Sequence, residues 1–237
     1  MGRPRRTQAG GLVYHVLNRA NARGQIFADA GDYAAFLRTL ADAQAEHPVR
    51  LLHYCVMPNH WHLLLWPERD GSLSRFVGWL TLTHTQRWHA YRGSAGAGHL
   101  YQGRLKSFAI EADEHYLTVA RYVERNALRA ALVQAAEQWP WGSLWQRLQT
   151  DGPDRPMLSA GPVPLPADWT TSVNAAQTAA EEAAIRRCLR RGQPYGNVAW
   201  VEATVKSFRL QSTQRRPGRP RKPAQPGQLL LFDENGS

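Results

Sequence analysis

His60 and His62, separated by a single tryptophan, are the residues whose types and spacing most directly suggest chemistry. They lie in residues 57–65, MPNHWHLLL, where a Pro-Asn break leads into an apolar run typical of a strand. Residues i and i+2 of a strand point to the same face, so we expect the two imidazoles to lie side by side. Neutral imidazole binds divalent ions, and a pair leaves positions for a substrate oxygen and a third ligand. The alternative interpretation is a pair of structural histidines.

A candidate nucleophile, Tyr122, lies in a predicted helix over residues 113–133, with Asp113 as its N-cap. The apolar stripe of this helix, which should face the core, consists of Tyr116, Ala120, Val123, Ala127 and Ala130. Tyr122 is off this stripe. Because four residues advance a helix by about 400°, it shares a polar stripe with Thr118, Arg125, Asn126 and Arg129. The alternative is a surface aromatic beside a ladder of helix salt bridges.

Tyrosine suits strand cleavage because its oxygen attacks phosphorus directly and the resulting phosphodiester conserves the bond energy for a later transfer. Asn126 follows one turn after Tyr122, and its amide oxygen could be the third metal ligand. Arg125 and Arg129 could hold the phosphates on either side. The other tyrosines considered as nucleophiles lack an amide one turn on; they are Tyr91, Tyr101 and Tyr116.

The elements that must position these side chains follow from the apolar periodicity. Strands are predicted over residues 12–18, 49–57, 60–66 and 105–110, and helices over residues 29–46, 72–91 and 113–133. The order β-α-β-β-α-β-α is that of an α+β, ferredoxin-like domain with an antiparallel sheet and one extra helix. His15 and His53 fall in the strands, where we expect core groups or groups that support a ligand.

The chain divides by composition into five segments. We expect a basic N-terminal arm over residues 1–8, the catalytic domain over 9–148 and a Gly- and Pro-containing linker over 149–174. A DNA-binding extension over 175–213 should hold two helices, residues 175–191 and 197–208, before a disordered basic tail over 214–237. The terminal cations are Arg3, Arg5, Arg6, Arg215, Arg216, Arg219, Arg221 and Lys222. Their Arg-Pro-Arg units suit either AT-hook-like contacts in a minor groove or a solvated charged tail.

Charge points to a polyanionic partner. The 237 residues carry 29 Lys and Arg against 19 Asp and Glu, a net charge of +10, and each neutralised phosphate would release condensed counterions. The two cysteines, Cys55 and Cys188, are far apart and form no zinc motif. No apolar run is long enough to span a bilayer, and no secretory signal follows the basic start. We therefore expect a cytoplasmic, nucleoid-associated protein that binds DNA and no membrane.

The sequence resembles the REP-associated tyrosine transposases over about residues 11–145. The matching segments, in order and spacing, are VYHV at 13–16, IF at 26–27, DY at 32–33, FL at 36–37, MPNHWH at 57–62, QGR at 102–104, KS at 106–107, RYVERN at 121–126 and RA at 129–130. Further matches follow at RGQPYG, 191–196, and GRPRK, 218–222. These proteins are related to the small insertion-sequence transposases, whose catalytic domain is a ferredoxin-like HUH fold.

The resemblance implies attack by Tyr122, a metal (Mg²⁺ or Mn²⁺) held by His60, His62 and Asn126, a 5′-phosphotyrosyl intermediate and a free 3′-hydroxyl. The substrate implied is single-stranded DNA near the foot of a palindromic repeat hairpin. Arg104 and Lys106 join Arg125 and Arg129 as expected DNA contacts. The sequence departs from the family pattern after the tyrosine, where Ala127 replaces a proline and Ala131 a glycine. Without the proline the helix can continue.

Two other functions fit the same residues. A regulator of repeat sequences could keep the fold and bind DNA through its basic surfaces without cleaving it. A metallohydrolase would need a carboxylate near the histidine pair, and the nearest, Glu68, lies beyond Pro67. Monomer and homodimer are both compatible with the sequence.

Overall fold

The computed structural model describes residues 9–21, 24–103, 105–149 and 155–214. The expected β-α-β-β-α-β-α order is confirmed by β1 (Val13–Arg19), α1 (Ala30–Glu46), β2 (Arg50–Met57), β3 (His60–Trp66), α2 (Ser72–Tyr91), β4 (Lys106–Ile110) and α3 (Glu114–Glu124). The chain continues through α4 (Asn126–Arg129), the 3-10 turn η2 (Ala136–Gln138), α5 (Ser143–Leu148), α6 (Trp169–Asn174), α7 (Ala179–Arg191), α8 (Val198–Ser207) and α9 (Gln211–Gln214). Among the described residues, no helix is long and apolar enough to cross a bilayer.

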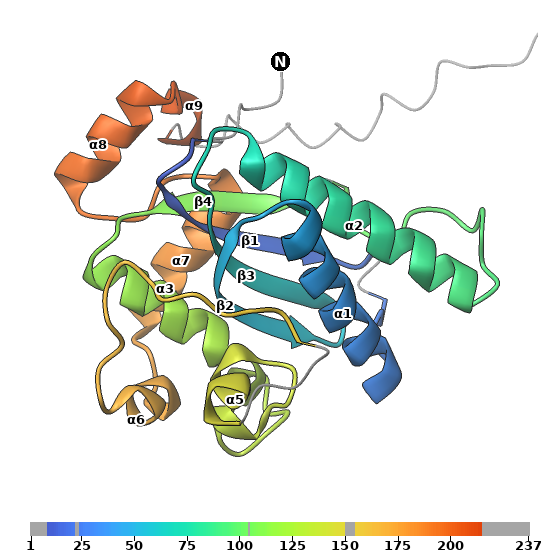
Figure 1. The fold of residues 1–237 in the computed structure, drawn as a ribbon. Helices are drawn as coiled ribbons and strands as arrows, with labels where there is room; N and C mark the ends of the chain where they lie inside the picture. Colours follow the sequence, from blue (N-terminus) through green and yellow to red (C-terminus); the bar gives the residue numbers. More distant parts are fainter. Residues whose placement is uncertain (1–8, 22–23, 104, 150–154, 215–237) are drawn as a thin grey trace, which may run out of the picture.

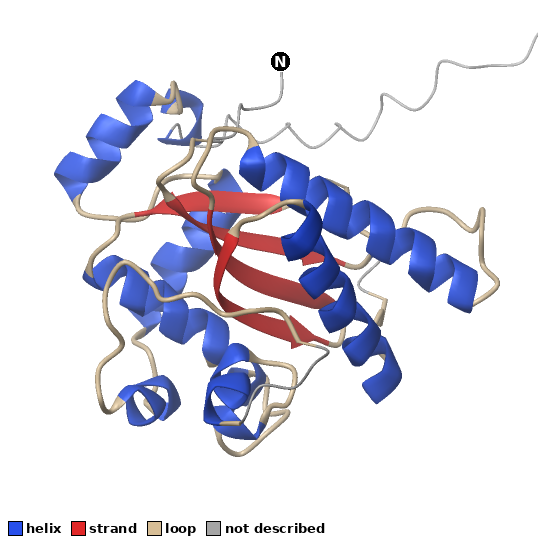
Figure 2. Cartoon of the chain, in the orientation of Figure 1, coloured by secondary structure: helices blue, strands red, loops and turns tan. Residues whose placement is uncertain are grey.

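The four strands form one antiparallel sheet in the order β2-β3-β1-β4, with helices on both faces (Figure 2). The central strand β1 pairs with β3 so that Leu17 lies opposite His62 and Arg19 opposite His60. An irregularity between Leu51 and His53 shifts the register of β2 against β3. A shift of this kind changes the face to which the following side chains point.

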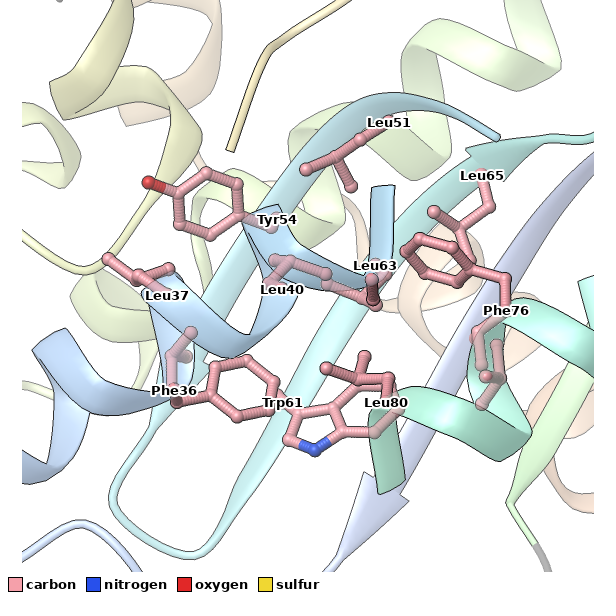
Figure 3. Close-up of a cluster of buried hydrophobic side chains, with 14 of the residues drawn as sticks. Phe36, Leu37, Leu40, Leu51, Tyr54, Trp61, Leu63, Leu65, Phe76 and Leu80 are labelled. Carbon is pink, nitrogen blue, oxygen red and sulfur yellow. The ribbon is translucent and has the colours of Figure 1, made fainter. Parts of the chain in front are cut away.

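The first face of the sheet is covered by α1 and α2, which lie side by side across it (Figure 1). Figure 3 shows the core between them, in which Trp61, Leu63 and Leu65 of β3 meet the apolar stripes of the two helices. The side chains facing the opposite direction along β3 include His60 and His62. Burial of Trp61 therefore fixes the face to which both histidines point.

The second face is covered by α3 and by the C-terminal segments, with α7 lying behind the sheet in Figure 1. Residues expected to form a linker instead pack against the domain: Leu158 bridges Leu51 at the edge of β2 and packs against the first core, and α6 buries Trp169 and Val173 in the second core. The two apolar side chains of α6 supply the burial that a free linker would lack. The two predicted helices of the extension are confirmed as α7, ending at Gly192, and α8, capped by Asn197.

The helix that carries Tyr122 is shorter than the predicted 113–133. It is interrupted at Arg125 and ends after Arg129. The side-chain amide of Asn126 donates to the carbonyl of Tyr122 at 2.9 Å, and such bonds compete with the backbone ladder. The end itself is a Schellman motif, in which the N–H groups of Ala131 and Leu132 donate to the carbonyls of Leu128 and Ala127.

Ala131 adopts a left-handed conformation, with φ of 55°, at the position where a Schellman motif favours glycine. We predict that Ala131→Gly raises the free energy of unfolding by about 1 kcal/mol because it removes a Cβ clash. Ala130, with φ of −86°, is the matched control, and Ala130→Gly should lower stability by about 0.5 to 1 kcal/mol. Urea denaturation of both variants measures the difference, and two shifts of the same sign would contradict the prediction.

Candidate active site

His60 and His62 open β3 directly after the turn at Pro58 and Asn59, and both point into a pocket of about 340 Å³. The backbone holds this turn firmly, because the carbonyl of Pro58 accepts from the N–H groups of Ile26 and Phe27. The ring centroids of the two histidines are 5.0 Å apart. The predicted side-by-side placement is therefore confirmed.

Each of the two rings is held through its Nδ1. Asn59 Oδ1 lies 2.6 Å from His60 Nδ1, and an amide oxygen can only accept, so His60 carries its proton there. His62 Nδ1 lies 2.8 Å from Nε2 of His15, a fully buried side chain of β1. His15 thus supports His62 from behind, as expected of a group that orients a ligand. Within the described part of the chain, no hydrogen bond engages Nε2 of His60 or of His62, and both residues line the pocket.

The two imidazoles are neutral at physiological pH. Burial lowers the pKa of His60 to about 4, with Arg19 and Arg129 acting in the same direction. Burial is also the largest cause that places the pKa of His62 well below its usual value, followed by its histidine and arginine neighbours. Neutral imidazole is the form that binds a metal ion.

Tyr122 lies against these histidines, with ring centroids 5.9 Å from His62 and 6.1 Å from His15. Its hydroxyl accepts from Arg129 Nη2 at 3.4 Å, and the Arg129 guanidinium carbon sits 4.8 Å from its ring centroid. Tyr122 is only 4% exposed. The prediction that it lies apart from the core face is therefore wrong, because its ring packs on the sheet against His15 of β1 and His62 of β3 and belongs to the core of this face.

The structure separates the three residues expected beside Tyr122. Arg129 lines the pocket. Asn126 is buried, and its Oδ1 accepts from Arg129 Nη2 at 2.6 Å, so the oxygen expected as a metal ligand is already engaged. Arg125 is not brought to the pocket, since its Nε donates to the carbonyl of Ala175 after α6. Arg121, one turn before Arg125, donates in the same way to the carbonyl of Ser172. Helical periodicity alone could not reveal these carbonyls, because they belong to a distant segment of the chain.

The lining of the pocket is strongly basic. Lys106 is there as predicted, and sequence reasoning missed three further cations: Arg19, Arg186 and Arg190. The position of Arg19 follows from strand pairing, because Arg19 lies opposite His60. For Arg186 and Arg190, the Arg-x-x-x-Arg spacing within a predicted helix indicates that both lie on one face. Arg104 and the cations of both termini, Arg3, Arg5, Arg6, Arg215, Arg216, Arg219, Arg221 and Lys222, lie outside the described residues.

Comparison with known proteins agrees with this geometry. The family described as "Transposase IS200 like" matches residues 8–126, the segment that carries the sheet, both pocket histidines and Tyr122. The chain belongs to the IS200-like transposase family. A Haemophilus influenzae protein with the provisional name REP-associated tyrosine transposase is 22% identical over 129 residues, 51% of this chain and 73% of the relative. The structure of a REP-associated tyrosine transposase bound to a REP hairpin is similar in fold, with a TM-score of 0.53, 17% identity and coverage of 68% of this chain and all of the other.

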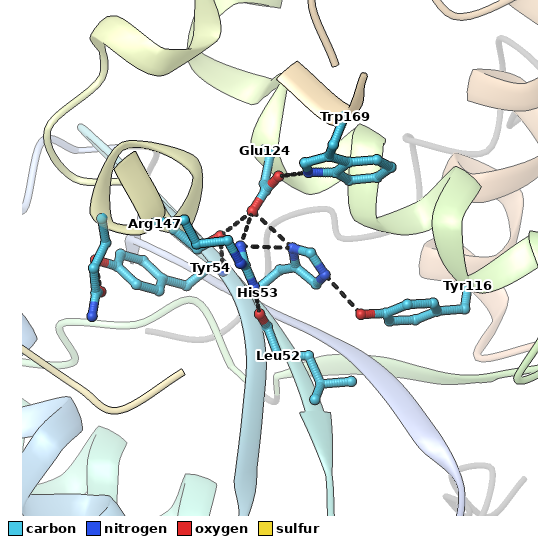
Figure 4. A network of polar contacts seen from close by, with 9 residues as sticks. Leu52, His53, Tyr54, Tyr116, Glu124, Arg147 and Trp169 are labelled. Atoms are coloured by element: carbon cyan, nitrogen blue, oxygen red, sulfur yellow. Dashed lines mark hydrogen bonds and ion pairs between the residues drawn. The ribbon is translucent and has the colours of Figure 1, made fainter. Parts of the chain in front are cut away.

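In this transposase family member, α3 is fixed by a carboxylate buried two residues after Tyr122. Glu124 Oε1 accepts from Arg147 at 2.5 Å, Ser143 at 2.5 Å and contacts His53 Nδ1 at 2.7 Å, and Oε2 accepts from Trp169 at 2.7 Å (Figure 4). Burial alone would raise the pKa of Glu124, but His53, Arg147 and Ser143 together lower it to about 2. His53 is thus a structural group, as expected.

A second cluster of potential ligands, Glu111, Asp113 and His115, lies within 4.8 Å at the start of α3. Its carboxylates already have structural partners. Glu111 accepts from the backbone and side-chain nitrogens of Asn197, each at 2.7 Å, and Asp113 caps α3 by accepting from the N–H of His115. We therefore assign this cluster to the junction between α3 and α8.

We predict that Glu124→Gln lowers the free energy of unfolding by about 3 kcal/mol, because breaking a buried pair leaves Arg147 uncompensated. The amide nitrogen of the substituted side chain would also face the indole N–H of Trp169, so that two donors would meet without an acceptor. Glu114→Gln, at an exposed site on the same helix, should change stability by less than about 0.5 kcal/mol. Equal effects of the two substitutions on thermal unfolding would contradict the structural role of Glu124.

Proposed function

We propose that this chain is a metal-dependent, single-tyrosine DNA nickase and strand transferase that acts on single-stranded DNA near the foot of a repeat hairpin. The observation that carries the proposal is the placement of Tyr122 against His62, inside a pocket lined by five cations. A nucleophile, a pair of neutral metal-binding groups and a phosphate-attracting surface meet there. The similarity to a REP-associated transposase seen with a REP hairpin supports the choice of substrate.

In the proposed reaction the Tyr122 oxygen forms a bond to a backbone phosphorus, and the bond from phosphorus to the 3′ oxygen breaks. The tyrosine loses its proton, and the leaving oxygen gains one to become a free 3′-hydroxyl. Arg129 already donates to the tyrosine hydroxyl, so its guanidinium can stabilise negative charge as it develops on that oxygen. Reversal with another 3′-hydroxyl rejoins the strands with no external energy source.

His60 and His62 suit a divalent ion, because both are neutral and both keep Nε2 free of the contacts that hold their Nδ1 atoms. We propose Mg²⁺ or Mn²⁺, which would polarise the phosphate oxygen. Asn126 suits a third position less well, because its Oδ1 must first leave Arg129. Arg129 would then be free to contact the phosphate. Breaking this one hydrogen bond would thus supply a ligand to the metal and a cation to the phosphate.

A single tyrosine can open only one strand at a time, and Tyr122 is carried on a helix packed on two sides. The phosphate must therefore bend into the pocket to reach it. An unpaired strand at the foot of a hairpin does this at lower cost than B-form duplex, whose stiffness opposes local bending. We accordingly assign unpaired DNA next to a hairpin as the substrate, and the repeats that flank the gene of this protein are the first sequences to test.

We predict that Tyr122→Phe abolishes covalent attachment to a single-stranded oligonucleotide while leaving its binding nearly unchanged, since one oxygen and no charge is removed. With the unchanged protein, a 3′ label should migrate with the protein on a denaturing gel and a 5′ label should appear in a shorter free fragment. Tyr91→Phe, at a site that is 82% exposed, is the control and should retain the adduct. Adduct formation by Tyr122→Phe would exclude Tyr122 as nucleophile, and tight binding with no adduct from the unchanged protein would favour the regulator.

We also predict that His15→Phe weakens Mn²⁺ binding about 10- to 100-fold, because His62 loses the partner that fixes its orientation. Free Mn²⁺ can be counted by electron paramagnetic resonance, which requires neither DNA nor activity. His84→Phe is the matched control, since His84 is another buried histidine and its Nδ1 lies 2.7 Å from the Tyr101 hydroxyl, away from the pocket. An unchanged Mn²⁺ affinity in a folded His15→Phe protein would remove this role of His15.

A further inference from the structure

One wall of the Tyr122 pocket is formed by α7, which lies outside the residues matched by the family model. Arg186, Leu189 and Arg190 of this helix line the pocket. The neighbouring face of α7 is anchored, because Ile185, Cys188 and the pocket-lining Leu189 are buried in the same core as Tyr122. The helix packs on β4 and on α3. Its position at the pocket is therefore set by the fold rather than by a free segment.

The two arginines of this wall are placed to meet an anion. Arg186 and Arg190 are four residues apart and share one face, where like charges cost a helix about 0.2 to 0.5 kcal/mol. The helix dipole favours a cation in the last turn, which accounts for Arg190, and Arg186 is paired with Glu182 one turn earlier. Both residues are exposed, and Arg190 makes no ion pair within the described part of the chain. An anionic ligand in the pocket would offset this repulsion.

A short ionic chain joins α7 to the nucleophile. Glu182, one turn before Arg186, lies 2.6 Å from its Nη2 and 3.7 Å from Nη1 of Arg129. Arg129 in turn donates to the hydroxyl of Tyr122. The carboxylate thus aligns one cation that faces the tyrosine and one that faces the open pocket.

We propose that Arg186 and Arg190 form a phosphate clamp that holds the DNA backbone next to the phosphate attacked by Tyr122, so that the C-terminal extension completes the active site of its own chain. This inference rests on the proposed function and names a contact that the catalytic residues do not provide. Guanidinium groups suit it because they grip phosphate oxygens through two parallel hydrogen bonds.

The sheet order separates this clamp from the attacked phosphate. His60 and His62 lie on β3, whereas α7 packs on β4, with β1 between the two strands. Two strand spacings amount to roughly 10 Å. Lys106, at the first residue of β4, continues the basic wall between them. The strand would therefore cross the end of the sheet, from the histidines to α7, over successive phosphates.

The test compares two double substitutions in the full chain, each carrying Tyr122→Phe so that only binding is measured. Arg186→Gln with Arg190→Gln removes the clamp. Arg187→Gln with Arg191→Gln removes two charges at the same spacing from the same helix, at residues that do not line the pocket. The probe is a fluorescent oligonucleotide with one hairpin and unpaired flanks, titrated at several salt concentrations.

The clamp substitutions should reduce the slope of log affinity against log salt by about 1.4, two single-strand contacts at about 0.7 each, and the control pair should leave the slope unchanged. Arg190→Gln alone should remove about half of this effect and serves if the double variant unfolds. Equal slopes for the two double variants, or no change with the clamp variant, would overturn the proposal. Absence of a covalent adduct with Tyr122 intact would instead refute the cleavage chemistry and leave the clamp standing.

Discussion

The fully buried carboxylate of Glu124 is the constraint on which the arrangement of the site depends. A charge without solvent must be paired and fully hydrogen-bonded, and its partners come from β2, α5 and α6. These contacts fasten α3 to the sheet on one side and to the C-terminal layer on the other. Arg147 also donates to the carbonyl of Leu52, next to the shifted register of β2. This anchoring positions α3. Tyr122, two residues before Glu124, therefore lies beside the histidines.

The histidines of the pocket differ from Glu124, because burial keeps them in their neutral form. Burial and nearby arginines keep His60 and His62 neutral, and the lining of the same pocket is basic. Imidazoles in the form suited to the proposed divalent ion therefore lie beside a surface suited to the proposed phosphate. Cys55 lies opposite His62 in the sheet and has its pKa raised to about 12 by burial. It is not among the described residues that line the pocket.

Most of the fold and the centre of the site could be predicted from the sequence. The bounds of β3 and α2 match the expected residues because alternation and a 3.6-residue period are local properties. The side-by-side histidines follow from the same local rule. Tertiary contacts decided the rest. Helical phase placed Tyr122 on a polar stripe, but the fold packs its ring on His15 and His62 of the sheet. The backbone carbonyls of Ser172 and Ala175 that hold Arg121 and Arg125 have no signature in sequence.

The location of α7 also has a consequence for how such proteins diversify. The segment matched by the family ends at residue 126, yet part of the wall around the nucleophile comes from residues 186–190. The extension therefore cannot be replaced without changing the wall of the pocket that holds Tyr122, His60 and His62. Under the proposed reaction, a recombination event that exchanges it would change strand binding and cleavage together.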